Sequence, residues 1–463
     1  MAYQTLNPYT GEVLATFNDA TDAEVESALE KGHQAFLQWK NTSFKERAKI
    51  LNNAAEILNK DINKYAQLLT LEMGKLLREA RSEVELSAKI LQYYVKNAEK
   101  HLQPEKLAVG KDAIEEAYLV HEPLGILLSV EPWNFPYYQV ARMLAPQLCA
   151  GNAVILKHAS NVPQAAAAFE KLMLDAGLPE GVFQNLYLTH KQINTVINDR
   201  RVCGVALTGS ETAGKIVASE AGLAMKKSTL ELGGADAFIV LKDADIDKTV
   251  EWAVFGRHWN AGQVCVSAKR MIIADEIYDE FIEKYRKGVA KLVAGNPMSP
   301  DTTLAPLSSQ KAVDDLKKLI EEAKEEGITV TEDGAPVPET GAFMRPTILT
   351  DIPEGVSTRY KEFFGPVSMI FRAKDEDDAI RIANDTPFGL GGSIFTRDVE
   401  RAKYLAKRIV TGMVYINHPT KVEPDLPFGG VGHSGYGREL TVLGLKEFVN
   451  HKLIAVTDIN SPF

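Results

Sequence analysis

The sequence predicts an α/β protein with two domains, each built on a doubly wound parallel sheet. The first observation is length, because 463 residues exceed what one hydrophobic core usually supports. The second is a strand–helix rhythm between residues 153 and 207, with a polar turn after the apolar runs. The third is the restart of this rhythm after Glu231. Strands that alternate with helices are typical of parallel βαβ units.

Local patterns predict the individual elements. The first third is mostly helical: a capping box at Thr21–Glu24 opens one helix, and two more are expected at about 45–58 and from 62 into the early nineties. Apolar residues between 115 and 131 then predict strands. In the two rhythms we expect strands at 153–156, 182–188, 202–207 and 237–241, and helices at about 163–176 and 246–257. A closing strand at 453–456 needs a sheet to join, in this subunit or another.

Composition narrows the class of protein. A hydrophobic content of 45% with 25% charged residues is ordinary for a globular enzyme, and the net charge of −10 argues against nucleic acid or an anionic membrane as the main partner. Three cysteines cannot form a paired framework, so a reducing cytoplasm is the expected compartment. The N-terminus lacks signal-peptide features, and no apolar stretch reaches the roughly 18 residues of a membrane span.

Three polar or glycine-rich turns are candidate cofactor sites. GVGHSG, residues 430–435, formally matches GxGxxG but does not end a predicted strand, so we expect a turn packed against the active site. The turn 208–214 follows a strand and opens a helix, which fits either a phosphate site or a plain capped helix. Lys157 leaves another strand and could meet an anionic or hydroxylated cofactor. No metal-binding spacing and no hydrolase elbow GxSxG is present in the sequence.

A cysteine and a carboxylate stand at two predicted strand ends. Glu231 follows an apolar residue at the end of a predicted strand and precedes the flexible pair Gly233–Gly234. Cys265 lies about one strand–helix unit later in the chain. Ends of parallel strands converge on one crevice, where a thiol nucleophile and a carboxylate base would suit covalent catalysis. Asn134, in another polar turn, could donate an N–H to an oxyanion. The alternative keeps Glu231 in a salt bridge and Cys265 in the core.

Taken together in order, the motifs resemble those of the NAD(P)-dependent aldehyde dehydrogenase family over essentially the whole chain. The motifs are NPYTGEV, EPWNFP, GNAVILKHAS, LTGSETAG, LELGG, NAGQVC, EFFGPV, NDTPFGLGGSIFTRD and PFGGVGHSGYGREL. The LKHAS variant and the length bring the chain nearest to the bacterial succinate-semialdehyde dehydrogenases. The resemblance implies a Rossmann-type cofactor domain at 1–104 and 124–231, an α/β catalytic domain at 232–436, and a small bridging or oligomerisation segment at 105–123 and 437–463.

By this resemblance, Cys265 is the nucleophile, Glu231 the base and Asn134 the oxyanion donor. The thiolate would attack the aldehyde carbon, and the adduct would lose hydride and become a thioester that water hydrolyses. A free thiol has a pKa of roughly 8.5, so either the site lowers it or Glu231 accepts the proton. The sequence leaves both possibilities open.

The resemblance also implies a cofactor site with no metal. Its residues are Trp133, Lys157, Ser160, Gly209, Ser210, Leu232, Glu362 and Phe364. NAD-preferring members often carry a glutamate at the position of Ser160, where its charge would repel a 2′-phosphate. The neutral serine beside Lys157 therefore favours NADP over NAD.

For the substrate, the resemblance implies that Arg142 binds a distal carboxylate, as in semialdehyde enzymes. The alternative is a structural ion pair on a helix. Val422 departs from the pattern, because succinate-semialdehyde members usually offer a serine there, and Lys421 or Thr420 would have to replace its hydrogen bond. Other open alternatives are another short aldehyde, a CoA-acylating enzyme and a non-catalytic relative. A homodimer or homotetramer is expected.

Overall fold

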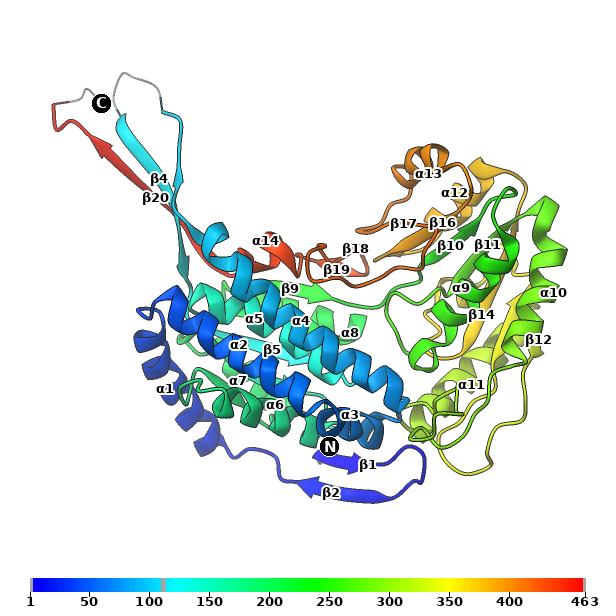
Figure 1. Ribbon diagram of the computed structural model, residues 1–463, viewed down its shortest axis with the longest axis horizontal. Helices are drawn as coiled ribbons and strands as arrows, with labels where there is room; N and C mark the ends of the chain where they lie inside the picture. The colour runs from blue at the N-terminus through cyan, green and yellow to red at the C-terminus, as the bar shows by residue number, and fades with distance from the viewer. Residues whose placement is uncertain (1–2, 110–113, 461–463) are drawn as a thin grey trace.

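The computed structural model describes residues 3–109 and 114–460. Residues 1–2 of the predicted cofactor domain, and residues 110–113 and 461–463 of the predicted bridging segment, lie outside the described residues. Two large sheets stand side by side, and a narrow arm projects from the first (Figure 1). Helices from the first hundred residues pack beside the first sheet, while the second sheet lies in the later, green-to-orange part of the chain. The α/β architecture with two parallel sheets is the one that the sequence predicts.

The first sheet has six strands in the order β19-β9-β8-β5-β6-β7. Their bounds are β5 Ile126–Glu131, β6 Ala153–His158, β7 Phe183–Asn185, β8 Val202–Thr208, β9 Lys227–Glu231 and β19 Gly435–Tyr436. Only β19 runs antiparallel to its neighbour. β7 is shorter than predicted because the chain turns onto itself after Asn185, with the Leu188 N–H donating to the Leu186 carbonyl. The strand order reverses between β5 and β8, which is where open α/β sheets place their ligands.

Eight helices of the described chain belong with this sheet. They are α1 Asp22–Trp39, α2 Phe44–Lys60, α3 Ile62–Met73, α4 Leu77–Leu102, α5 Pro136–Ala150, α6 Pro163–Asp175, α7 His190–Asn198 and α8 Glu211–Leu223. The single helix expected from residue 62 is wrong, because Gly74 breaks it into α3 and α4 with a φ of +80°. A Cβ at Gly74 would lie 2.8 Å from Pro306 Cγ, so both the turn and the packing require glycine.

The second sheet has seven strands in the order β12-β13-β14-β11-β10-β16-β17. Its strands are β10 Ala237–Val240, β11 Arg270–Ala274, β12 Thr329–Glu332, β13 Thr347–Thr350, β14 Val367–Ala373, β16 Gly392–Phe395 and β17 Tyr415–Ile416. Its helices are α9 Ile246–His258, α10 Tyr278–Val289, α11 Gln310–Glu325, α12 Glu376–Asn384 and α13 Val399–Ala406. The edge strand β12 alone is antiparallel.

The arm is a three-stranded sheet in the order β20-β4-β3. Its strands are β20 Val449–Thr457, β4 Ile114–Pro123 and β3 Glu105–Lys106. The predicted closing strand thus joins a sheet of its own subunit. The remaining strands and α-helix of the described chain are the hairpin β1 Tyr3–Leu6 and β2 Val13–Phe17, the pair β15 Phe388–Gly389 and β18 Val431–Gly432, and helix α14 Thr441–Leu445. Short 3-10 helices lie at Trp259–Gly262, Asp275–Ile277 and Ser357–Tyr360. Among the described residues, no helix is both long and apolar enough to cross a bilayer.

Candidate active site

The loop before Cys265 has an unusual backbone that side chains hold in place. Asn260, Ala261 and Gly262 all have positive φ, at 52°, 54° and 77°. Such residues persist only where their surroundings fix them. Here the Asn260 amide donates to the carbonyls of Asn134 and Gln263, at 3.1 and 3.2 Å, and the Gln263 amide donates back to the Asn260 carbonyl at 3.1 Å. The small and polar residues before Cys265 therefore shape the loop.

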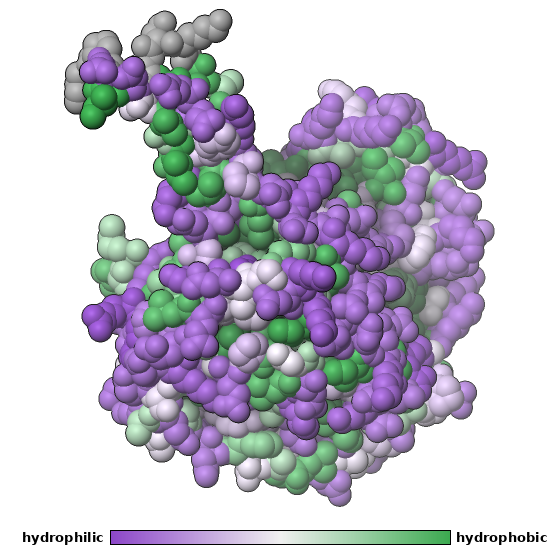
Figure 2. All heavy atoms as spheres, turned by 60° about the vertical axis from the view of Figure 1, so that its left-hand side comes forward, coloured by the Kyte–Doolittle hydropathy of each residue, from purple (hydrophilic) through white to green (hydrophobic). Residues whose placement is uncertain are grey.

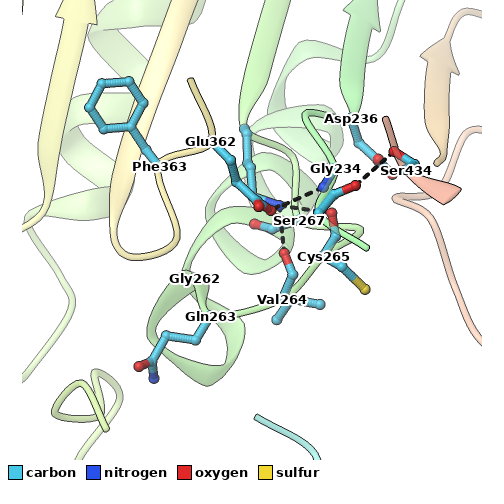
Figure 3. Close-up of polar contacts among 12 residues, drawn as sticks. Gly234, Asp236, Gly262, Gln263, Val264, Cys265, Ser267, Glu362, Phe363 and Ser434 are labelled. Atoms are coloured by element: carbon cyan, nitrogen blue, oxygen red, sulfur yellow. Dashed lines mark hydrogen bonds and ion pairs between the residues drawn. The ribbon is translucent and has the colours of Figure 1, made fainter. Parts of the chain in front are cut away.

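Lys269, which was not among the residues predicted from the sequence, holds the backbone of Cys265 through hydrogen bonds to main-chain carbonyls. Its buried ammonium donates to the carbonyls of Val264 and Cys265, both at 2.7 Å, and lies 3.0 Å from a Glu362 oxygen. The same Glu362 oxygen accepts the Gly234 N–H at 3.1 Å. In Figure 3 the Cys265 sulfur points away from these contacts and is left unused by them. One sequence signal could have identified Lys269: it directly precedes an apolar strand, and a charge buried there must have polar partners.

The LELGG motif needs its two glycines because other groups come so close. A Cβ at Gly233 would lie 2.2 Å from a Glu362 carboxylate oxygen, and one at Gly234 would lie 2.5 Å from the Cys265 carbonyl oxygen. The turn 430–435 closes this side, since Ser434 donates its hydroxyl to the Gly233 carbonyl at 2.7 Å (Figure 3). The weak GxGxxG match is thus a turn against the active site, as expected.

The Cys265 thiol is half-buried and holds its proton tightly. Burial raises its pKa to about 12, the charges of Lys269 and Arg142 oppose that rise, and Glu231 adds to it. The charges of Lys269 and Arg142 therefore lower the thiol pKa by less than burial raises it. Of the two possibilities that the sequence left open, the site therefore favours transfer of the thiol proton to a base.

Glu231 ends β9 with a buried carboxyl group that no hydrogen bond reaches. Burial raises its pKa to about 8, Arg142 opposes the rise, and Glu439 increases it. A Cβ at Gly429 would lie 2.7 Å from Glu231 Oε1, so glycine there leaves room for the carboxyl group. Glu231 lies close enough to influence the pKa of the Cys265 thiol, but it does not line either cavity that the thiol reaches.

One of these cavities, of about 290 Å³, contains most of the predicted cofactor residues. Its lining includes Trp133, Asn134, Gly209, Ser210, Leu232, Cys265, Glu362 and Phe364. Asn134 donates one amide hydrogen to the Gln263 carbonyl at 3.1 Å, which leaves its second N–H for another acceptor. Ser210 caps α8, so the free N–H groups of the first turn of this helix lie at the same edge of the first sheet. The carboxyl ends of the first sheet's strands therefore supply the amide and a helix N-terminus, whereas the thiol reaches them from the loop before β11 of the second sheet and not from a strand end of the same sheet.

Lys157 and Ser160 do not line that cavity but stand one strand farther along the same edge. Lys157 is paired with Val130 in the β5–β6 register, and Ser160 follows in the next turn. Burial lowers the pKa of the Lys157 ammonium, and no carboxylate in the described part of the chain offsets this. A cation without a counter-charge is thus held at the carboxyl edge, which fits an anionic ligand.

The second cavity, of about 310 Å³, is lined mainly by aromatic and apolar side chains. Its lining includes Phe135, Tyr138, Trp252, Trp259, Val422 and Phe428. Cys265 and Gln139 line both cavities, so the thiol stands where they meet. Lys421 is the one lysine or arginine among the described residues around this second cavity.

Arg142 does not line this cavity, contrary to the expectation from the sequence. It lies on α5, which is buried along its whole length, and it forms an ion pair with Glu439. Its guanidinium donates to the Tyr138 hydroxyl at 2.8 Å and to Thr208 Oγ1 at 3.3 Å. Phe428 covers it, with the ring centroid 4.5 Å from Cζ. The structure thus shows the ion pair that was the alternative, because a guanidinium on a fully buried helix needs a counter-charge.

The chain is similar to known proteins over nearly its full length. The profile of the aldehyde dehydrogenase family matches residues 1–454. The chain belongs to the aldehyde dehydrogenase family. It is 46% identical to the succinate-semialdehyde dehydrogenase [NADP(+)] of Deinococcus radiodurans, over 98% of this chain and 94% of that protein. The corresponding Mycobacterium bovis protein is 42% identical, over 98% and 99%.

The fold of this aldehyde dehydrogenase also matches solved structures. The succinic semialdehyde dehydrogenase from Streptococcus pyogenes in complex with NADP+ superimposes with a TM-score of 0.96 at 45% identity, covering 99% of this chain and 100% of that one. A succinate-semialdehyde dehydrogenase from Burkholderia pseudomallei gives a TM-score of 0.94 at 32% identity, covering 99% and 95%. The predicted family and fold class are confirmed.

Replacing Gly234 with alanine should disable the site without unfolding the protein. The new Cβ would displace the Cys265 carbonyl, and a shift of about 1 Å at a reacting group costs on the order of 100-fold in rate. Initial rates of aldehyde-dependent cofactor reduction measure the loss. Gly222→Ala is the matched control, since no atom lies within 4 Å of its added Cβ. Equal rates for the two variants would contradict the assigned geometry.

Proposed function

We propose that the chain oxidises succinate semialdehyde to succinate with NADP, through a thioester on Cys265. The observation that carries the proposal is the position of this thiol at the junction of two cavities, one at the strand ends of the first sheet and one lined by aromatic rings. The first suits a dinucleotide, and the second suits a short aldehyde. The names of the Deinococcus and Streptococcus relatives support the substrate and the cofactor.

The chain's own residues supply the covalent chemistry in this proposal. The Cys265 sulfur adds to the aldehyde carbon as its proton passes to a base, and the oxyanion accepts N–H bonds from Asn134 and the Cys265 backbone. Bound NADP supplies the hydride acceptor that turns the adduct into a thioester. Glu231 then removes a proton from water, which attacks the acyl carbon as the C–S bond breaks. Because its carboxyl group lies outside both cavities, Glu231 must rotate toward the thioester.

NADP fits the carboxyl edge of the first sheet. The α8 N-terminus at Ser210 would receive the pyrophosphate, and Glu362 would hold the nicotinamide ribose. Lys157 and Ser160 would face the adenine ribose, where the ammonium attracts a 2′-phosphate and the serine does not repel it.

A charge at Ser160 should therefore reverse the cofactor preference. In Ser160→Glu, the carboxylate would face the 2′-phosphate, and because like charges in contact cost several kcal/mol, kcat/KM for NADP should fall about 100-fold. The value for NAD should change little. Steady-state rates with each cofactor measure both. The neutral Ser160→Gln is the control for side-chain size. A wild-type enzyme that prefers NAD would refute the assignment.

We propose that Lys421 binds the distal carboxylate of the substrate. Lys421 lines the aromatic cavity together with Cys265. The Arg142 guanidinium, in contrast, lies behind the rings of Tyr138 and Phe428 and is paired with Glu439. Lys421 forms an ion pair with Glu423, and the incoming carboxylate would compete for its charge. The Lys421 ammonium can thus replace the hydrogen bond that a serine at the position of Val422 would make.

Two variants separate these roles when succinate semialdehyde is compared with butanal. Lys421→Met should raise KM for succinate semialdehyde roughly 10- to 100-fold, since a hydrogen bond to a charged group is worth about 1.5–3 kcal/mol, and should leave KM for butanal unchanged. Arg142→Leu should lower kcat for both aldehydes. Lys318→Met, far along the exposed face of α11, is the control. A KM effect confined to Arg142→Leu and to succinate semialdehyde would restore the direct role of Arg142.

We also propose that the arm joins subunits into a homodimer or homotetramer. β20 is an edge strand, and Leu453, Ile454 and Val456 on it are 59%, 47% and 42% exposed. Figure 2 shows apolar side chains along the projecting arm. Exposed apolar edge strands pair with other chains unless they are covered.

Charges on one face of β20 should dissociate the assembly. Ile454 and Val456 are two residues apart, so Ile454→Glu with Val456→Glu places both carboxylates on the same face. Sedimentation velocity should then show the monomer. Leu223→Glu, at a residue 78% exposed on α8, is the control and should sediment like the wild type. A monomeric wild-type protein would rule out the proposal.

We place the enzyme in the cytoplasm. All three cysteines, Cys149, Cys203 and Cys265, are free thiols in the structure. Free thiols persist in a reducing compartment, and the proposed chemistry requires Cys265 in that state.

A further inference from the structure

Three neighbouring strands of the first sheet place Glu131, Thr208 and Glu231 in a row. Thr208 is paired with Glu231 in the β8–β9 register, and Val130, just before Glu131, is paired with Leu207. Glu131 is thus level with Thr208, which in turn lies beside Glu231. All three residues stand at the carboxyl end of the sheet, next to the site of the thiol.

Arg142 is the cation that these groups share. From α5 it donates to Thr208 Oγ1 at 3.3 Å and is paired with Glu439, which follows β19. Its charge also stabilises the ionised forms of Glu131 and Glu231. The other nearby guanidinium, Arg438, donates to the carbonyls of Gly430 and Gly437 at 2.8 and 2.7 Å. Three carboxyl groups therefore depend mainly on one guanidinium.

The carboxyl groups of this cluster are buried, and several of their oxygens have no hydrogen-bond donor. Glu131, Glu231 and Glu439 are 3%, 3% and 8% exposed. Glu131 accepts the Ser129 hydroxyl on one oxygen at 2.6 Å, but its other oxygen and both oxygens of Glu231 have no partner. A set of buried carboxylates cannot all ionise around one cation, so the cluster retains protons near neutral pH.

The pKa values of the group follow this pattern. Burial raises the pKa of Glu131 to about 8, with the charge of Glu439 as a further cause. Burial raises that of Glu231 to about 8 as well, and both Glu439 and Glu131 contribute to the rise. Arg438 opposes the rise in the pKa of Glu231, and Glu447 adds to the rise in the pKa of Glu439. Other groups near the cluster include the Cys265 thiol, the Tyr138 hydroxyl and His158, whose pKa burial lowers to about 4, so His158 is neutral and adds no charge.

We propose that Glu131 is a positioning residue for the base of thioester hydrolysis: by sharing the Arg142 charge with Glu231, it sets how readily Glu231 takes a proton from water. The inference rests on the proposed function, because it assigns Glu131 a role in the same reaction. Glu131 touches neither cavity and acts only through Glu231.

The test measures hydrolysis of the acyl-enzyme alone, without cofactor. p-Nitrophenyl acetate acylates the thiol with a burst of nitrophenolate, and the steady rate that follows reports deacylation. Glu131→Gln removes the carboxyl group that competes with Glu231 for the Arg142 charge, so the pKa of Glu231 should fall. The acidic limb of the deacylation profile should then move to lower pH by roughly one unit. Glu131→Asp should keep the limb in place.

Two further variants keep the test decisive. Ser129→Ala removes the hydrogen bond that favours ionised Glu131, so it should give a smaller shift in the same direction even if Glu131→Gln folds poorly. Glu170→Gln, a half-buried carboxyl on α6 that accepts the Asn185 N–H, is the control and should show no shift.

The outcomes distinguish the two proposals. If Glu231→Gln deacylates as fast as the wild type, the proposed function of Glu231 fails. In a second outcome, Glu231→Gln shows only the burst, while Glu131→Gln and Ser129→Ala keep the acidic limb of the deacylation profile at the wild-type pH. The inference about Glu131 then fails, and the proposed function stands. A lower rate at every pH without movement of the limb would show a merely structural role and would likewise overturn it.

Discussion

The catalytic loop depends on one buried ammonium group. Lys269 has no exposure to solvent, and its three donors are matched by the Val264 and Cys265 carbonyls and by Glu362. Without it, two buried carbonyls would lose their donor and Glu362 its counter-charge, a loss of several kcal/mol in total. The same contact links the second sheet to the glycine turn after β9, because Glu362 also accepts the Gly234 N–H. Together with the hydrogen bonds that join Asn260 and Gln263 to Asn134, this charge positions the nucleophile relative to the cofactor edge.

Much of this arrangement could be predicted from the sequence, because strand ends and glycines are local signals. The turn after β8, the LELGG glycines and Asn134 each follow an apolar run, and parallel topology alone brings such residues to one edge. The break at Gly74 was missed, since the helical periodicity continues on both sides of it. The left-handed turn at Gly74 and the close approach of Pro306, more than two hundred residues away in the chain, become visible only in the folded structure.

The charged residues of the interior were harder to predict. Whether Arg142 faces a substrate or a carboxylate depends on where Glu439 lies, and the two are almost three hundred residues apart. Glu131 opens the EPWNFP motif and Lys269 stands four residues after Cys265, but neither position reveals that Lys269 pairs with Glu362 or that Glu131 lies level with Thr208 on a neighbouring strand. Sequence patterns identify the groups that must be buried, but the pairing of buried charges is a property of the tertiary structure.

The C-terminal segment has a consequence for how the protein folds. β19, at residues 435–436, pairs with the strand that carries Glu231, and β20 pairs along β4, which precedes it by more than three hundred residues. The first sheet and its arm are therefore incomplete until the end of the chain has been synthesised. Contacts of such long sequence separation form slowly, because loop closure must precede them. The first sheet and the arm cannot be completed before residues 435–457 have been synthesised, and their strand edges stay exposed until then.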